Sequence, residues 1–182
     1  MTILESEISQ IDKENIKIIR QNVSTFIKKL SQRFDGRGKL LLDIAPQDYC
    51  GAKEFFHKSI IKTLDINPRS KSDYILDICK TNYKYIGDDY FDYILCTEVL
   101  EHTLNPFAAV LEIKRILKAG GYFFISVPFN LRIHGPLPDC WRFTEHGIRV
   151  LLKEFLIEDM NVIETNNRPL MPIHYTIIAR NK

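Results

Sequence analysis

The sequence predicts an α/β domain: a seven-stranded, mostly parallel sheet with one antiparallel strand and helices on both faces. Short apolar segments alternate with amphipathic helical segments, a pattern typical of a parallel sheet that is covered on both sides. The last two apolar segments are joined by residues 165–172, which are too few for the crossover that parallel neighbours need. These two segments should therefore form an antiparallel hairpin. Because no repeat or linker-like composition interrupts the chain, we expect residues 1–182 to form a single domain.

The first half of the chain begins with a predicted helix and continues with predicted strands. Residues 7–33 carry isoleucine, valine, phenylalanine and leucine at helical steps with charges between them, which predicts an amphipathic helix. Gly36 and Gly38 end this pattern. The apolar run at 39–45 has the composition of a strand buried on both faces. Further elements are predicted as a helix at 52–58 and strands at 60–66, 74–77 and 90–96.

The second half carries clear helix signals. Asn105 and Pro106 are the cap and the first-turn proline of a helix that Gly120 and Gly121 should close. Thr144 can cap another helix that runs through Phe155. The remaining elements are predicted as strands at 122–127, 156–164 and 173–179, with a loop rich in proline, histidine and arginine at 128–143.

Composition and charge exclude several classes of protein. The chain is 45% hydrophobic and 26% charged, which is ordinary for a soluble protein, and no apolar run approaches the ~20 residues that span a bilayer. The N-terminus lacks the basic residues and apolar core of a signal peptide, so we expect a cytoplasmic protein with no membrane partner. A net charge of +2 is too balanced to indicate a nucleic-acid partner. The four cysteines form no CxxC pair, and His57, His146 and His174 do not cluster, so no metal site is expected.

Acidic residues end four of the predicted strands. They are Asp43, Asp65, Asp77 and Glu98. Ligands of open α/β sheets bind beyond the carboxyl ends of the strands, and an acid at the end of the second strand is suited to accept hydrogen bonds from a ribose diol. Each acid alone could instead be a helix cap or a turn residue. Four at the same edge favour a ribose-containing cofactor.

The turn after the first strand limits the choice of cofactor. A dinucleotide site needs the spacing G-x-G-x-x-G, and the turn here runs D-I-A-P-Q-D-Y-C-G from Asp43 to Gly51. The chain also lacks the G-K-[ST] signature of a phosphate-binding loop. A nucleoside without a pyrophosphate therefore suits this edge better than a dinucleotide.

Three motifs carry a resemblance to a known family. Residues 91–102 read F-D-Y-I-L-C-T-E-V-L-E-H, residues 117–121 read L-K-A-G-G, and residues 134–144 read H-G-P-L-P-D-C-W-R-F-T. From Lys39 to Phe155 the chain resembles class I S-adenosylmethionine-dependent methyltransferases, in particular the small type 11 group. The resemblance implies a Rossmann-like fold and S-adenosylmethionine as the cofactor. A stretch similar to residues 134–144 occurs in members linked to sugar and cell-surface glycan gene clusters.

The resemblance implies a role for each strand end. It places Asp43, Ile44 and Ala45 under the methionine part of the cofactor, Asp65 on the ribose hydroxyls with Ile66 against adenine, Asp77 and Ile78 beside the adenine amino group, and Cys96, Thr97 and Glu98 between the methionine part and the substrate. The family's first motif is usually D-x-G-x-G-x-G. Here Ala45 and Gln47 stand where the first two glycines are expected, with Pro46 between them, which bears on cofactor affinity.

Methylation of a hydroxyl also needs a group that accepts the proton. His134 is the first candidate because it lies in the loop after the fifth strand, and Glu98, His102 and Asp139 are the others. Each histidine could equally make a structural hydrogen bond. Together with His134, three residues of the loop are candidates for substrate binding: Asp139, Trp141 and Arg142.

Two of these loop residues allow two roles each. Arg142 could hold a phosphate or carboxylate, or could pair with Asp139 to fix the loop. Trp141 could be a platform for a sugar face or could fill the core. The helix within residues 1–36 and the loop at 128–143 are the segments outside the core at 39–182, so we expect them to form a lid over the substrate.

The sequence therefore predicts a methyltransferase that acts on a small molecule, as a monomer or a homodimer. The expected reaction is O-methylation of a sugar, a nucleotide-sugar or another surface-glycan precursor, by analogy with the family. Two alternatives stay open. One is N- or O-methylation of another metabolite, and the other is a methyltransferase-like binding protein without catalysis.

Overall fold

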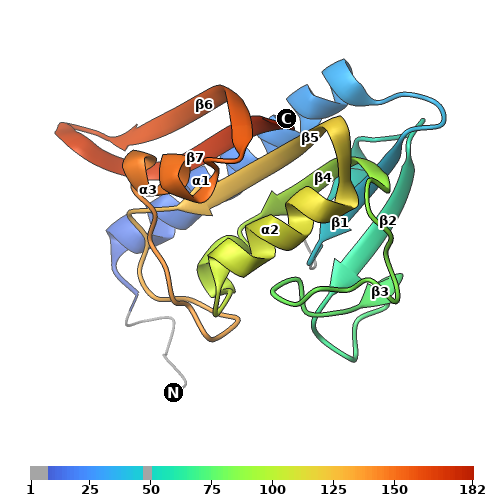
Figure 1. Ribbon diagram of the computed structural model, residues 1–182. Helices are drawn as coiled ribbons and strands as arrows, with labels where there is room; N and C mark the ends of the chain where they lie inside the picture. Colours follow the sequence, from blue (N-terminus) through green and yellow to red (C-terminus); the bar gives the residue numbers. More distant parts are fainter. Residues whose placement is uncertain (1–7, 47–50) are drawn as a thin grey trace.

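The computed structural model describes residues 8–46 and 51–182, and it contains the predicted seven-stranded sheet (Figure 1). The strand order is β3-β2-β1-β4-β5-β7-β6, and β7 runs antiparallel to both of its neighbours. The elements in chain order are α1 (Gln10–Phe34), β1 (Leu40–Ile44), the short 3₁₀ helix η2 (Ala52–Glu54), β2 (Ile60–Asp65), β3 (Tyr74–Ile75), β4 (Phe91–Thr97), the 3₁₀ helix η3 (Leu100–His102), α2 (Pro106–Ile116), β5 (Leu117–Pro128), α3 (Glu145–Leu151), β6 (Phe155–Thr165) and β7 (Arg168–Asn181).

Helices cover the sheet on both faces, as predicted. The long helix α1 lies behind the sheet and α2 in front of it (Figure 1). On the α1 face, Phe34 packs against the rings of Tyr93, Tyr122 and Phe124, with ring centroids 4.7 to 5.6 Å apart. The other face holds a larger apolar cluster that includes residues of α2, α3 and six strands. Burial of these two apolar layers stabilises the fold and holds the strand ends in fixed positions.

The predicted helix at 52–58 is wrong, because only residues Ala52–Glu54 form a 3₁₀ turn. The carboxylate of Asp35 explains the difference. It accepts hydrogen bonds from the backbone N–H groups of His57, Lys58 and Ser59 at 2.8 to 3.0 Å. These donors are thereby held in a turn that leads into β2, and they are not available for a helix.

The helix that begins at Pro106 ends earlier than predicted. Asn105 caps it as expected, but the helix stops at Ile116 and β5 begins at Leu117. Gly120 and Gly121 therefore belong to the strand rather than to the helix end. Gly121 is required there because a Cβ at this position would lie 2.9 Å from the carbonyl oxygen of Asp92 on β4.

The C-terminal elements confirm the predicted hairpin. Thr144 caps α3, which ends at Leu151 rather than Phe155. The strands β6 and β7 are joined only by residues 166 and 167, and Asn167 has a positive φ of 58° in this turn. Both strands are longer than predicted.

Most of α1 is a layer of the fold rather than a cover for a site. Its side chains Ile19, Phe26, Ile27 and Leu30 are buried. Its N-terminal part approaches the loop after β5, where the Asn15 amide donates to the carbonyl oxygen of Asn130 at 2.8 Å. A lid role for this part and for the loop stays a prediction. In residues 8–46 and 51–182 no helix combines the length and the apolar character needed to cross a bilayer.

Candidate active site

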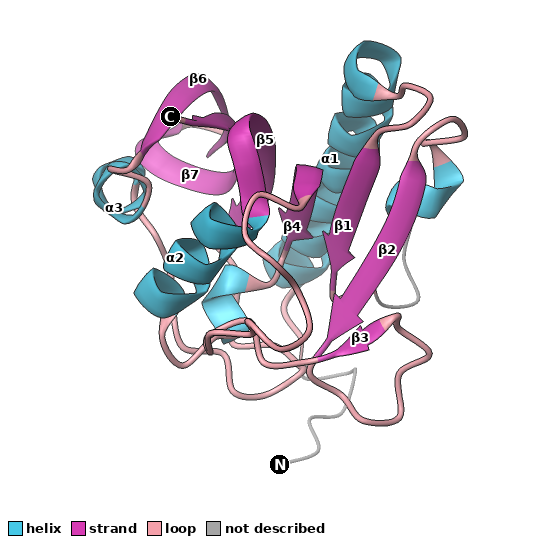
Figure 2. Ribbon diagram, turned by 45° about the vertical axis from the view of Figure 1, so that its right-hand side comes forward, coloured by secondary structure: helices cyan, strands magenta, loops and turns pink. Residues whose placement is uncertain are grey.

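The carboxyl ends of β1, β2 and β4 lie side by side at one edge of the sheet (Figure 2). Ile44 on β1 is paired with Leu64 on β2 and with Cys96 on β4. The residues that follow Ile44, Leu64 and Cys96 therefore lie next to one another at the same end of the sheet. The predicted strand-end acids and their neighbours do come together at this edge, which is where open α/β sheets bind ligands.

Asp43 is buried and fixes the turn that follows β1. Its Oδ2 accepts a hydrogen bond from the backbone N–H of Ala52 at 2.7 Å. Gly51 is packed so closely that a Cβ there would lie 2.6 Å from the same oxygen. Burial raises the pKa of the Asp43 carboxyl to about 7. Asp43 thus shapes the turn and has no open surface for a ligand.

Ala45 has the backbone conformation that favours glycine. Its φ is +52°, in the left-handed region, at the position where the family has its first glycine. Its N–H donates to the carbonyl oxygen of Leu64 at 2.7 Å. The chain therefore follows the path of a glycine turn although alanine is present. Pro46 follows at intermediate exposure, and Gln47 and Cys50 lie outside the described residues.

Asp65, Ile66 and Asp77 form an accessible group, which we name the open edge. Asp65 Oδ1 accepts from the backbone N–H of Asn67 at 2.8 Å. Its Oδ2 has no protein donor in the described part of the chain. Ile66 is 67% exposed, and Asp77 Oδ1 accepts from the N–H of Cys79 at 2.9 Å. Among the described residues, Asp65 Oδ2 therefore has no protein partner, whereas Asp77 Oδ2 lies 3.6 Å from the ammonium of the exposed Lys80.

Two residues that the sequence assigned to the cofactor lie in the core. Ile78 is 6% exposed and belongs to the larger apolar cluster, and Cys96 is fully buried in the same cluster. Burial raises the pKa of the Cys96 thiol well above its ordinary value. These two side chains therefore pack beneath the strand ends as part of the core and do not line the accessible edge.

Glu98 is held by two protein donors. Its Oε1 accepts from the hydroxyl of Ser126 at 2.8 Å and lies 2.7 Å from Nε2 of the buried His174. The other ring nitrogen of His174 lies 2.8 Å from the Asn22 amide nitrogen, which can only donate, so the proton of His174 is assigned to Nε2. Sequence reasoning missed His174, because its contact with Glu98 depends on β7 lying beside β5.

The loop that follows β5 is fixed by an ion pair. Arg142 donates to both carboxylate oxygens of Asp139, at 2.5 and 2.7 Å, and to the carbonyl oxygens of Leu131 and Arg132. The Asp139 side chain is fully buried, and the guanidinium helps to lower the pKa of its carboxyl to about 2. Of the two roles that the sequence allowed for Arg142, the structure has the pairing with Asp139.

Trp141 is anchored at one end and open at the other. Its indole N–H donates to the carbonyl oxygen of Thr103 at 2.8 Å, and its ring stacks on Phe143 with centroids 6.2 Å apart. It remains 39% exposed. The ring therefore combines a packing contact with an accessible apolar surface.

Both candidate histidines face one buried carboxylate. The rings of His102 and His134 are 4.8 Å apart, and Glu101 lies against both. Burial lowers the pKa of His134, so its ring is a proton acceptor near neutral pH. We name the group formed by Glu101, His102, His134, Asp139 and Arg142 the loop cluster.

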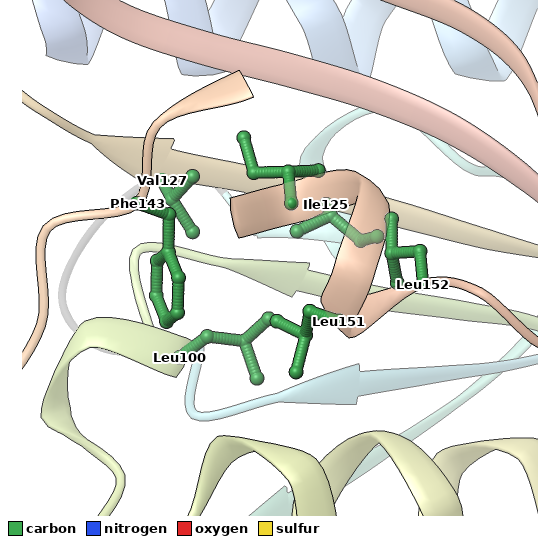
Figure 3. Close-up of a pocket in the computed structure, with 7 residues that line it drawn as sticks. Leu100, Ile125, Val127, Phe143, Leu151 and Leu152 are labelled. Carbon is green, nitrogen blue, oxygen red and sulfur yellow. The ribbon is translucent and has the colours of Figure 1, made fainter. Parts of the chain in front are cut away.

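A small pocket next to the loop cluster is lined by aliphatic and aromatic side chains (Figure 3). It lies between α3, β5 and the start of η3. Because none of the side chains that line it is polar, it has no group to orient a substrate. Its lining residues are Leu100, Ile125, Val127, Phe143, Ile148, Leu151 and Leu152.

Comparisons with known proteins agree with this geometry. Residues 52–125 match the type 11 family model described as a methyltransferase domain. Among solved structures, the chain is similar to a SAM-dependent methyltransferase from Methanosarcina mazei, with a TM-score of 0.59, 18% identity, and coverage of 81% of this chain and 93% of that one. No curated protein matches the sequence.

The names of two further similar structures state which kind of atom each enzyme methylates. The N-methyltransferase NodS from Bradyrhizobium japonicum, in complex with S-adenosyl-L-homocysteine, has a TM-score of 0.65, 14% identity, and coverage of 90% of this chain and 87% of that one. The CurJ carbon methyltransferase has a TM-score of 0.64, 15% identity, and coverage of 91% of this chain and 55% of that one. The resemblance to class I S-adenosylmethionine-dependent methyltransferases is confirmed, and S-adenosylmethionine is the cofactor that it implies.

Proposed function

We propose that this methyltransferase domain binds S-adenosylmethionine along the open edge and methylates a small molecule, with the hydroxyl of a sugar or surface-glycan precursor as the first candidate acceptor. Bound S-adenosylmethionine supplies an electrophilic methyl group. The tasks left to the protein are to hold the cofactor, align the acceptor, exclude water and receive a proton.

The free oxygen of Asp65 is the observation that carries this proposal. Asp65 ends β2 beside the left-handed turn at Ala45, and its Oδ2 has no donor among the described residues. A ribose diol has two hydroxyl donors that suit a carboxylate in this position. The exposed Ile66 next to it can pack against an adenine ring. The residues present therefore fit a nucleoside at this edge.

The proposed proton acceptor is a histidine of the loop cluster. His134 is neutral near physiological pH because burial lowers its pKa, and His102 lies beside it. Glu98 already accepts from Ser126 and contacts His174, which favours a positioning role for this carboxylate. Either loop histidine can therefore receive the proton of an acceptor hydroxyl.

The choice of a sugar rests on the loop after β5. The exposed part of Trp141 offers the apolar face on which a sugar ring can stack. The H-x-x-P-x-D-x-W-R-F-T stretch points the same way by family analogy. NodS is named an N-methyltransferase and CurJ a carbon methyltransferase. Methylation of a nitrogen or carbon atom of the acceptor is therefore the second possibility.

A second candidate function is that of a binding protein without catalysis. Ala45 stands where a glycine is expected in the turn after β1, and Pro46 follows it. The methyl group of an alanine at positive φ leaves less room for a cofactor to approach the backbone. This function predicts a domain that keeps the fold but binds the cofactor weakly or transfers no methyl group.

Calorimetric titration with S-adenosylmethionine and S-adenosylhomocysteine tests the proposal. We expect binding in the micromolar range for the unchanged protein. Asp65→Ala should weaken it about 10- to 100-fold, because it removes hydrogen bonds to a charged acceptor worth about 1.5–3 kcal/mol. The substitution should leave the unfolding transition nearly unchanged, since among the described residues the Asp65 side chain accepts one short-range hydrogen bond.

Asp159→Ala is the matched control. Asp159 is an exposed aspartate on β6, at the far edge of the sheet, and its loss should leave the affinity unchanged. If the unchanged protein gives no heat and no thermal stabilisation at millimolar ligand, the enzyme proposal fails. Tight binding without methyl transfer to any acceptor in a panel of sugars, amines and enols would favour the binding protein.

A further inference from the structure

Glu101 is an unusual residue because its carboxylate is completely buried and has no hydrogen-bond donor. Its side chain is 0% exposed, and neither Oε1 nor Oε2 accepts a hydrogen bond from another residue in the described part of the chain. Burial of an unpaired carboxylate costs several kcal/mol and is rare in native proteins unless the group has a function. A ligand that compensates the charge would remove this cost.

Two imidazole nitrogens point at this carboxylate. Nε2 of His102 lies 3.8 Å from Glu101 Oε1, and Nε2 of His134 lies 3.9 Å from the same oxygen. One potential ligand atom from each of the three residues, a carboxylate oxygen or a ring nitrogen, lies within 4.8 Å of the other two. The three side chains thus surround one small volume.

The outer nitrogen of each ring is already occupied. Nδ1 of His102 lies 3.0 Å from the carbonyl oxygen of Pro138, and Nδ1 of His134 lies 3.0 Å from Oδ2 of Asp139. Since a carbonyl or carboxylate oxygen accepts, each Nδ1 carries the proton. Each Nε2 therefore presents a lone pair toward Glu101. Metal-binding histidines are oriented in this way, by a second hydrogen bond to a carbonyl or a carboxylate.

We propose that Glu101, His102 and His134 form a binding site for a divalent transition-metal ion, coordinated by one carboxylate and two Nε2 atoms. This replaces the expectation of no metal, which considered His57, His146 and His174 but not the residues that the loop brings together.

The spacing needs only a small contraction to bind an ion. Ligand atoms at about 2.1 Å from a tetrahedral metal lie about 3.4 Å apart. In the structure the two nitrogen–oxygen distances are 3.8 and 3.9 Å. A shift of about half an ångström closes each nitrogen–oxygen gap. Since the three ligand atoms lie within 4.8 Å of one another, the two nitrogens need to approach each other by at most about 1.4 Å, a movement that the two imidazole rings can share.

The surrounding charges fit a dication. The charged neighbours of Glu101 are the carboxylates of Glu98 and Asp139 and the guanidinium of Arg142. Three carboxylates against one guanidinium leave two negative charges, which a divalent cation would balance. Burial and the neighbouring Glu98 raise the pKa of the Glu101 carboxyl well above its ordinary value while no cation is present.

The ligand set favours some metals over others. Two imidazoles and one carboxylate are typical of Zn²⁺, Co²⁺ and Fe²⁺, whereas Mg²⁺ prefers oxygen ligands. Three protein ligands leave at least one coordination position open. If the proposed function is correct, that position can take the acceptor hydroxyl and ease the loss of its proton, and with the ion bound the two histidines act as its ligands in place of the proton acceptors proposed above. The metal site itself does not depend on the proposed function.

Cobalt(II) titration of the full-length protein, without S-adenosylmethionine, tests the site directly. We expect one equivalent to bind, with visible absorption bands of a nitrogen- and oxygen-ligated ion and a rise in the midpoint of thermal unfolding. Glu101→Gln should lower the affinity at least 10- to 100-fold, because it removes the charged ligand. It should fold, since it replaces a buried charge that has no partner with a neutral isostere.

Histidine variants separate ligation from packing. In His102→Asn and His134→Asn, the asparagine amide can replace the Nδ1 donor to Pro138 or Asp139, but Nε2 is lost. Both variants should fold and lose the visible bands. His146→Asn changes an exposed histidine on α3 and should bind cobalt unchanged.

Three outcomes would overturn the proposal. The first is an absence of stoichiometric cobalt binding by the unchanged protein. The second is binding that survives Glu101→Gln and both asparagine variants. The third is a thiolate charge-transfer band that disappears in Cys140→Ser, which would place the ion on the exposed Cys140 instead. Loss of cobalt binding with intact S-adenosylhomocysteine binding would separate this site from the cofactor site.

Discussion

The open edge and the loop cluster lie at the same end of the sheet, but their side chains are satisfied in different ways. At the open edge, Asp65 and Asp77 accept short-range backbone bonds. Asp65 keeps one carboxylate oxygen without a donor among the described residues, and the second oxygen of Asp77 pairs only with the exposed Lys80. In the loop cluster, the bonds of Asp139 and Arg142 hold the loop after β5 in place. The comparison shows that the open edge is shaped to receive donors from a ligand, whereas the loop cluster is ordered by the protein itself.

This difference separates the effects of substitutions. A change at the open edge removes something that a ligand uses, so affinity should fall while stability stays the same. A change in the loop cluster leaves a buried partner uncompensated, so stability should fall first. Glu101 is the exception within the loop cluster, since its missing donor is what indicates a metal.

The largest expected effect is that of Arg142→Leu. It leaves the fully buried carboxylate of Asp139 without its bidentate partner, which should lower the free energy of unfolding by about 3 kcal/mol. Urea denaturation followed by circular dichroism measures this loss. Arg149→Leu is the control, because its exposed pair with Glu145 is worth about 0.5 kcal/mol or less. Equal losses of unfolding free energy in the two variants would contradict the claim that Arg142 and Asp139 hold the loop in place.

Asp43→Asn tests the buried carboxylate beneath the open edge. The pKa of Asp43 is raised from 3.8 to about 7, so the native state binds more protons than the unfolded state between these pH values. Stability from this group is therefore complete below about pH 4 and is lost as the pH rises to 7, with a slope of at most about 1.4 kcal/mol per pH unit.

Unfolding free energies of both proteins, measured from pH 4 to pH 8, check this sign. Asparagine can still accept from the N–H of Ala52, so the variant should keep the turn and lose the pH-dependent contribution. The difference between the two curves isolates Asp43 from other titrating groups. Parallel curves for the two proteins would contradict the raised pKa.

The smallest expected effect is that of Ala45→Gly. Glycine relieves the positive φ of 52° but gains freedom in the unfolded chain, so stability should change by less than about 1 kcal/mol. The affinity for S-adenosylhomocysteine should rise a few-fold, because the backbone becomes more accessible. Calorimetry of both proteins decides, and a weaker affinity in the variant would argue against cofactor binding at this turn.

The hydrophobic periodicity and the residues at the strand ends were sufficient to predict the sheet from the sequence. The alternation of apolar runs and helices, the Asn105 cap and the short link before β7 predicted the α/β class and the antiparallel hairpin. These signals are local, and a buried strand leaves a continuous apolar run wherever it lies. The acids of the open edge were predicted for the same reason, since Asp65 and Asp77 each follow such a run.

Other features were decided only by the tertiary structure. The short η2 depends on Asp35, which lies more than 20 residues before the N–H groups that it binds. His174 meets Glu98 because β7 lies beside β5, and His134 meets Glu101 because the loop folds back over η3. A buried polar contact between distant residues leaves no periodic trace in a sequence. The sequence by itself thus determined the sheet, the hairpin and the acids of the open edge, and the tertiary structure decided which carboxylate was left without a partner.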